Sequence, residues 1–133
     1  LEQYFQYVSE RFLDRVQSLI NHPPSQQLKE FTEIWFKSAS STKEEIGFML
    51  ECFGAAVNNK TLHTITAKFE KDCKAVLERI LSKPNKVAPI RVKKDTAQAT
   101  YSLMIGLRSS VYFDDIELEE ARRLFLRAVE RFN

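Results

Sequence analysis

The sequence predicts an all-α domain with about six helices. Three glycines and four prolines in 133 residues are far fewer than the roughly 16 that average composition would give, which argues against a turn-rich β fold. Apolar residues recur at steps of three and four along most of the chain, the spacing of one helix face. A chain of this length is expected to form one domain.

Helix-breaking and helix-capping residues divide the first part of the chain into four helices. Pro23 and Pro24 end the first helix, because two prolines cannot continue it, and Ser25 can cap the second. Thr42 opens a capping box with Glu45, and Asn59 can cap the fourth helix. The expected helices cover residues 1–21, 25–39, 42–57 and 60–81.

The last third of the sequence predicts a loop and two further helices. The loop contains an extended stretch through Ile90 and Val92, and Asp95 is expected to cap the fifth helix. That helix is apolar on nearly every side, with Arg108 as its one definite charge, so it must be covered all round. Asp114 and Asp115 are expected to end it and to cap the sixth helix. The ranges are 82–94 for the loop, 96–113 for the fifth helix and 116–132 for the sixth.

Composition excludes several classes of partner and location. The net charge of +2 gives no bulk reason to expect nucleic acid or an anionic membrane as a partner. Cys52 and Cys73 do not make a disulfide framework, so we expect a reducing, cytoplasmic location. No run approaches the roughly 18 apolar residues of a membrane span. Leu1 follows no capping residue, so we expect the sequence to begin inside a helix of a longer protein.

No residue pattern in the sequence predicts catalysis. The three glycines lie far apart inside helical patterns, so no phosphate-binding loop is present. His63, Cys52 and Cys73 match no known metal-ligand spacing. The lysines of the fourth helix alternate with acidic residues, and we interpret them and the basic residues of the loop as a solvated face rather than a phosphate-binding surface. We expect no enzyme activity, no cofactor and no metal.

Two sets of apolar residues suggest binding. The first could line an apolar cavity with a few polar groups, the usual makeup of a small-molecule site; an ordinary core is the alternative. This candidate pocket consists of Trp35, Met49, Phe53, Thr66, Tyr101 and Met104.

The second set of apolar residues lies on the last two helices. Gly106 costs about 1 kcal/mol relative to alanine in mid-helix and suggests close approach of another helix. A buried internal core is the alternative here. This candidate dimer interface consists of Gly106, Ala121, Leu124, Phe125, Ala128 and Phe132.

The order of these segments resembles the C-terminal regulatory domain of a TetR-family transcriptional regulator. The most specific stretch is residues 90–99, Ile-Arg-Val-Lys-Lys-Asp-Thr-Ala-Gln-Ala, with an apolar-Arg pair, a capping Asp and an Ala-rich helix start. Residues 102–107 resemble the apolar-Gly-Leu centre of the family's penultimate helix. Two further matches are 114–117 followed by Leu124-Phe125-Leu126, and 47–50 with Asn58-Asn59.

The resemblance implies an effector-sensing domain of a dimeric repressor. Residues 1–94 would enclose a pocket for a small, mostly apolar effector, and 95–133 would form a four-helix bundle with a second subunit. Operator DNA would be bound only by an N-terminal helix-turn-helix domain absent from this sequence, and residues 1–20 resemble the helix that connects to it. Effector binding would change the spacing of the two DNA-binding heads and release DNA. The alternative is a non-enzymatic helical scaffold or adaptor dimer with a packed core and no ligand.

Overall fold

The computed structural model describes residues 1–36, 42–82 and 90–132, and within these ranges every regular element is helical, as predicted. A short 3-10 turn, η1, follows the first of six α-helices. In chain order the elements are α1 (Glu2–Gln17), η1 (Ser18–Asn21), α2 (Pro24–Phe36), α3 (Thr42–Ala55), α4 (Lys60–Leu81), α5 (Ile90–Tyr112) and α6 (Leu118–Phe132).

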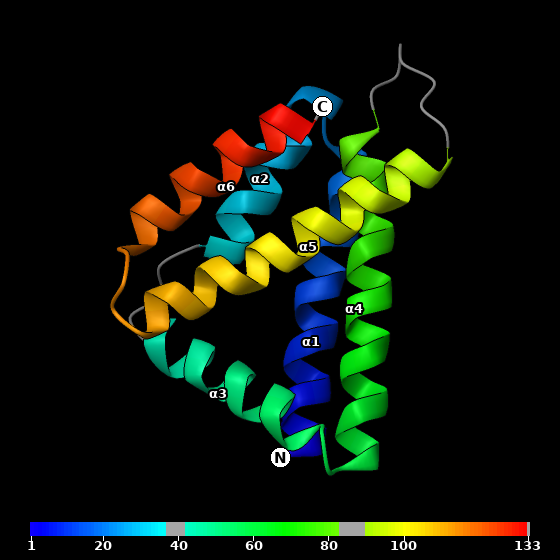
Figure 1. Ribbon diagram of the computed structural model, residues 1–133. Coiled ribbons are helices and arrows are strands. Elements are labelled where there is room, and N and C mark those ends of the chain that lie inside the picture. The colour runs from blue at the N-terminus through cyan, green and yellow to red at the C-terminus, as the bar shows by residue number, and fades with distance from the viewer. Residues whose placement is uncertain (37–41, 83–89, 133) are drawn as a thin grey trace.

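The helices pack as crossing pairs around one main core (Figure 1). α1 and α4 lie side by side, α5 crosses them, and α6 runs along α2. α3 packs against α4 and α5. Each α-helix contributes side chains to the main cluster of buried apolar residues, which includes Val16 of α1, Phe31 of α2, Ile46 of α3, Leu77 of α4, Met104 of α5 and Phe125 of α6.

Several predicted helix boundaries are confirmed. α2 begins directly after Pro23, and Pro24 is its first residue, a position where its missing N–H is not needed. Ser25 therefore lies inside α2, and the prediction that it caps this helix is wrong. Asn59 caps α4: its side-chain oxygen accepts a hydrogen bond from the Leu62 backbone N–H at 3.0 Å. The Asn59 amide also donates to Glu2 Oε1 of α1 at 2.9 Å. One side chain therefore starts α4 and fixes it to the first turn of α1.

The predicted start of the fifth helix is wrong. α5 already begins at Ile90, so Asp95 lies inside it and residues 90–94 are helical rather than extended. Arg and Lys are good helix formers, and no residue between Ile90 and Asp95 interrupts a helix. The helix is therefore free to start before the capping signal. The rest of the predicted loop, 83–89, lies outside the described residues, as do residues 37–39 of the second predicted helix.

Asp114 and Asp115 end α5 as predicted, but they do not cap the sixth helix. α6 begins at Leu118, two residues later than expected. The Asp115 N–H donates to the Ser110 carbonyl at 3.0 Å and the Asp114 N–H to that of Val111 at 3.1 Å. Asp114 has a φ of 61°. This is the Schellman arrangement, in which a left-handed residue closes the last helical turn.

The third helix also stops earlier than the sequence predicted. α3 ends at Ala55, so Val57, the last residue of the predicted range 42–57, lies beyond it and is 79% exposed. Gly47 of α3 lies against α5: a Cβ atom at this position would be 2.8 Å from Cε1 of Tyr112. The absence of a side chain at Gly47 therefore lets the Tyr112 ring lie directly on the α3 backbone.

Candidate functional site

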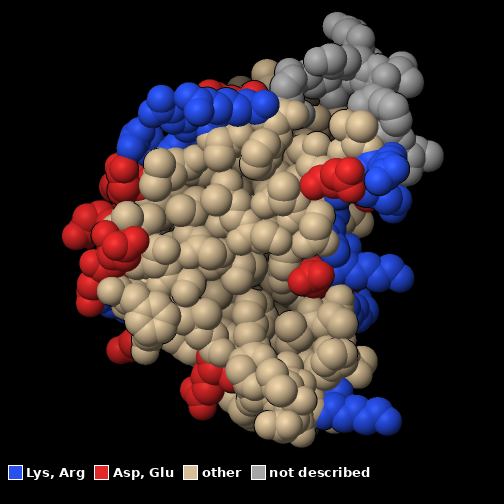
Figure 2. Space-filling model, viewed as in Figure 1, with Lys and Arg blue, Asp and Glu red and all other residues tan. Residues whose placement is uncertain are grey.

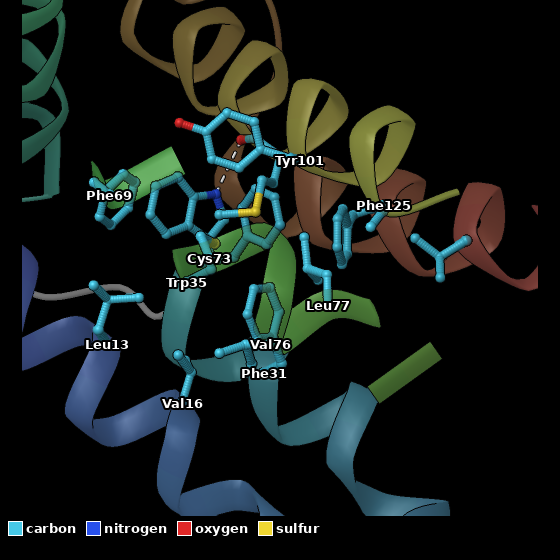
Figure 3. Packing of buried hydrophobic residues seen from close by; sticks show 14 of the residues in the cluster. Leu13, Val16, Phe31, Trp35, Phe69, Cys73, Val76, Leu77, Tyr101 and Phe125 are labelled. Atoms are coloured by element: carbon cyan, nitrogen blue, oxygen red, sulfur yellow. Dashed lines mark hydrogen bonds between the residues drawn. The ribbon is translucent and has the colours of Figure 1, made fainter. Parts of the chain in front are cut away.

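The most distinctive polar contact in the interior joins α2 to α5 through Trp35. Its indole Nε1 donates to the backbone carbonyl of Met104 at 2.9 Å, the dashed line in Figure 3. One turn further along α5, the guanidinium carbon of Arg108 lies 4.2 Å from the centroid of the Trp35 ring. Arg108 thus stacks on the indole as a cation on an aromatic face.

Arg108 is a half-buried cation with few protein partners. Its Nε is buried and has no hydrogen-bond partner, and none of the ion pairs among the described residues includes it. Burial lowers the pKa of Arg108 to about 10, and the Glu45 carboxylate acts in the opposite direction. The side chain is therefore still charged at neutral pH, with one face covered by Trp35.

The structure brings four of the six candidate pocket residues into one cluster. Trp35, Met49, Tyr101 and Met104 are all buried members of the main core. Tyr101 lies close to Phe69, with ring centroids 6.4 Å apart, and both are labelled in Figure 3.

The other two candidate pocket residues lie apart from this cluster or at its margin. Phe53 is half-buried and contacts the Phe5 ring of α1, with centroids 6.1 Å apart. Thr66 is half-buried on α4, and its hydroxyl oxygen has no hydrogen-bond partner. The hydroxyl of Thr100, a fully buried residue beside Tyr101, is also without a partner. Unpartnered hydroxyls in an aromatic interior are groups that a ligand could use.

Sequence reasoning missed Arg108 as a site residue. The only sign of it was that a single charge interrupts an otherwise apolar helix. Its stacking partner Trp35 is 73 positions earlier in the chain, and no local pattern predicts that α2 and α5 meet there.

A surface depression of about 290 Å³ lies elsewhere, between the end of α1 and α2. It is lined by Arg15, Leu19, His22, Glu30, Glu33 and Ile34, none of which belongs to the candidate pocket. Two of its acidic residues have close partners: Glu30 Oε2 lies 2.5 Å from His22 Nδ1, and Arg122 of α6 binds Glu33 at 2.7 Å. Nothing in this lining selects a particular ligand.

The cysteines have the environment of inert core thiols. Both are buried, and burial raises the pKa of Cys73 to about 12. Burial also raises the pKa of Cys52. Among the residues described, no group of three or more His, Cys, Asp or Glu side chains could hold a metal ion.

A broad face without charged side chains covers α5 and the adjoining part of α6 (Figure 2). Basic and acidic groups surround this face but do not enter its centre. Gly106 of α5 is exposed, and a Cβ atom added to it would meet nothing within 4 Å. Helical spacing puts Ala99, Ser102 and Ser110 on the same outward side of α5. We call this surface the α5–α6 face.

The six candidate interface residues divide between this face and the core. Ala121 and Phe125 are fully buried within the single chain, because α6 docks on α2 and the Phe125 ring stacks on Phe31. These two residues therefore belong to the chain's own core and not to a surface open to a second copy. Leu124 and Ala128 are half-buried, Phe132 is 43% exposed, and Gly106 is open to solvent.

Comparisons with protein-family models, with curated proteins and with solved structures found no match to this chain. Within the described part of the chain, no helix combines the length and the apolar character needed to cross a bilayer.

Proposed function

We propose that this chain is the effector-sensing and dimerisation domain of a TetR-like transcriptional repressor. Binding of a small, mostly apolar ligand near Trp35 would shift the spacing of two DNA-binding heads, which lie outside this sequence, and release DNA. The observation that carries the proposal is the uncharged α5–α6 face, formed by the two helices that the resemblance assigns to dimerisation.

Physical reasoning supports a second copy of this chain as the occupant of the α5–α6 face. Leu124 and Ala128 of α6 are only half-buried and Gly106 of α5 is exposed, and a second copy would cover this surface. A glycine in mid-helix costs about 1 kcal/mol relative to alanine, and no neighbour within this chain requires it. A two-fold contact makes the same face complementary to itself. A stable interface of this kind should bury at least about 1,200 Å² in total.

Light scattering coupled to gel filtration tests the dimer. The unmodified chain should be a dimer at micromolar concentration, and Gly106→Arg should give a folded monomer because a charge in an apolar seam has no partner. Leu124→Glu should act in the same way. The matched control is Gly54→Arg on α3, since Gly54 is also exposed with open space around its Cβ position. A stable monomer for the unmodified chain would contradict the proposal.

The second candidate function is a scaffold or adaptor dimer that binds no effector. It is favoured by the burial of Trp35, Met49, Tyr101 and Met104 in the packed core. The two functions differ in ligand binding and not in assembly, so a dimer with no response to any small molecule would favour the scaffold.

A further inference from the structure

Among the described residues, Nε is buried without a hydrogen-bond partner in both Arg108 and Arg122, but Arg122 forms ion pairs with Glu33 and Glu119 whereas Arg108 forms none of the ion pairs found there. Burying a guanidinium without a partner is costly, and the Trp35 stack covers only one of its faces. The Nε that lacks a hydrogen bond is a donor on the guanidinium edge. Carboxylates bind such an edge through two parallel N–H···O bonds, which are among the strongest hydrogen bonds in proteins.

The surroundings of Arg108 suit the apolar body of the same ligand. Met104 precedes Arg108 by one helical turn, and Met104 and Met49 belong to the main buried cluster together with Trp35, on which Arg108 stacks. Thioether side chains repack readily around an inserted group. The rings of Trp35 and Tyr101 supply flat apolar surface nearby. A ligand with a charged end and an apolar chain would therefore satisfy both the cation and the interior.

We propose that Arg108 is the anion-binding residue of the effector site and that the effector is an amphiphilic organic acid, held by its carboxylate on the guanidinium and by its apolar chain among the neighbouring core residues. This inference rests on the proposed effector-sensing function. Glu45 is the intramolecular anion that competes for Arg108 electrostatically, so its removal should strengthen binding of the acid.

Trp35 is the only tryptophan in the chain, so its fluorescence reports directly on the Arg108 stack. The intact dimer is titrated with octanoate, octan-1-ol and octylamine, which share an alkyl chain and differ in charge, and with inorganic phosphate as a bare anion. Octanoate should change the Trp35 emission saturably, with an affinity at least about tenfold above that of octanol. Octylamine should bind more weakly still, and phosphate alone should give no saturable change.

Variants then assign the preference to Arg108. Arg108→Gln should remove the preference for octanoate over octanol, and Arg108→Lys should keep part of it, because lysine retains the charge but loses the two-pronged geometry. Glu45→Gln should tighten octanoate binding. The control is Arg122→Gln. Arg122 of α6 is a half-buried arginine that pairs with Glu33 of α2 and with Glu119 of its own helix, so octanoate affinity should not change. Circular dichroism checks that each variant is folded.

The outcomes separate this inference from the proposed function. The first outcome is measured on the unmodified chain alone. Equal affinities for octanol and octanoate would overturn the inference while leaving an apolar effector site in place. Unchanged octanoate affinity in folded Arg108→Gln would overturn it too. A saturable response to phosphate alone would mean that the site takes simple anions and not organic acids. No response to any probe by an intact dimer would overturn the inference and favour the scaffold.

Discussion

Asp114 is a single residue whose backbone conformation determines how α5 ends. With a φ of 61° it occupies the left-handed region, where the β-carbon of an L-residue is crowded and where Asp is tolerated better than most. Its carboxylate also pairs with Lys43 of α3. The turn between α5 and α6 thus depends on a residue that accepts this conformation.

Replacing Asp114 with valine should destabilise the protein by about 1–2 kcal/mol, because a β-branched side chain is poorly accommodated at positive φ. Asp114→Gly should cost much less, since glycine has no such restriction. Urea denaturation followed by circular dichroism measures both. Asp115→Val is the control, because Asp115 lacks a positive φ; an equal loss in this control would mean that the backbone conformation is not the cause.

At the scale of elements, Asn59 joins α4 to α1. The same side chain caps α4 and donates to Glu2, and this second bond is the main cause of a lowered pKa for the Glu2 carboxyl. A lowered pKa means that the ionised form is favoured in the folded protein. The hydrogen bond from Asn59 to ionised Glu2 therefore contributes to folding stability at neutral pH, and this contribution is lost as the pH falls through the folded-state pKa of Glu2.

Asn59→Ala should cost about 1–2 kcal/mol of unfolding free energy through loss of the cap. In this variant the pKa of Glu2 should rise toward its ordinary value. Asn59→Ser keeps a capping oxygen but lacks the amide that donates to Glu2. It should therefore be more stable than Asn59→Ala, while its Glu2 pKa should be as high as in Asn59→Ala. Urea denaturation gives the stabilities, and carboxyl chemical shifts during an NMR pH titration give the pKa. A lowered Glu2 pKa in Asn59→Ala would show that Asn59 does not cause the shift.

Local chemistry in the sequence predicted some helix boundaries correctly. Pro23–Pro24 and Asn59 mark boundaries that the structure confirms. The start of α5 was predicted too late, because residues 90–94 can form a helix and Asp95, although a suitable capping residue, does not cap α5. Periodicity also shows that α6 has an apolar face but not what covers it. Ala121 and Phe125 are buried within their own chain because α6 docks on α2, a contact that the periodicity of α6 does not predict.

The candidate site was predictable only in part, because it too depends on which helices meet in the folded chain. The large apolar side chains of Trp35, Tyr101 and Met104 indicated a shared interior, and they meet there. Arg108 acquires its special environment from a crossing of two helices far apart in sequence. Its position in the chain shows a charge on an apolar helix, whereas its burial and its stacking on Trp35 exist only in three dimensions.

For the molecule as a whole, charge is spread in both signs around an uncharged face (Figure 2). A net charge of +2 predicts few of the phosphate contacts on which tight DNA binding depends. We expect only weak, salt-sensitive binding of this chain to any duplex, measured by fluorescence anisotropy against labelled DNA of unrelated sequences. A footprint on a defined operator by this chain alone, at physiological salt, would contradict the proposal that DNA is bound by a domain outside this sequence.

The docking of α6 on α2 has a consequence for biosynthesis. α2 presents Phe31 and Phe36 to Phe125, and Glu33 to Arg122, 89 positions later. As the chain leaves the ribosome from its amino end, this aromatic surface of α2 exists well before α6 is translated. We expect the part of α2 that Phe125 covers in the folded chain to stay accessible during that interval, while Phe12 of α1 can already pack against Phe31.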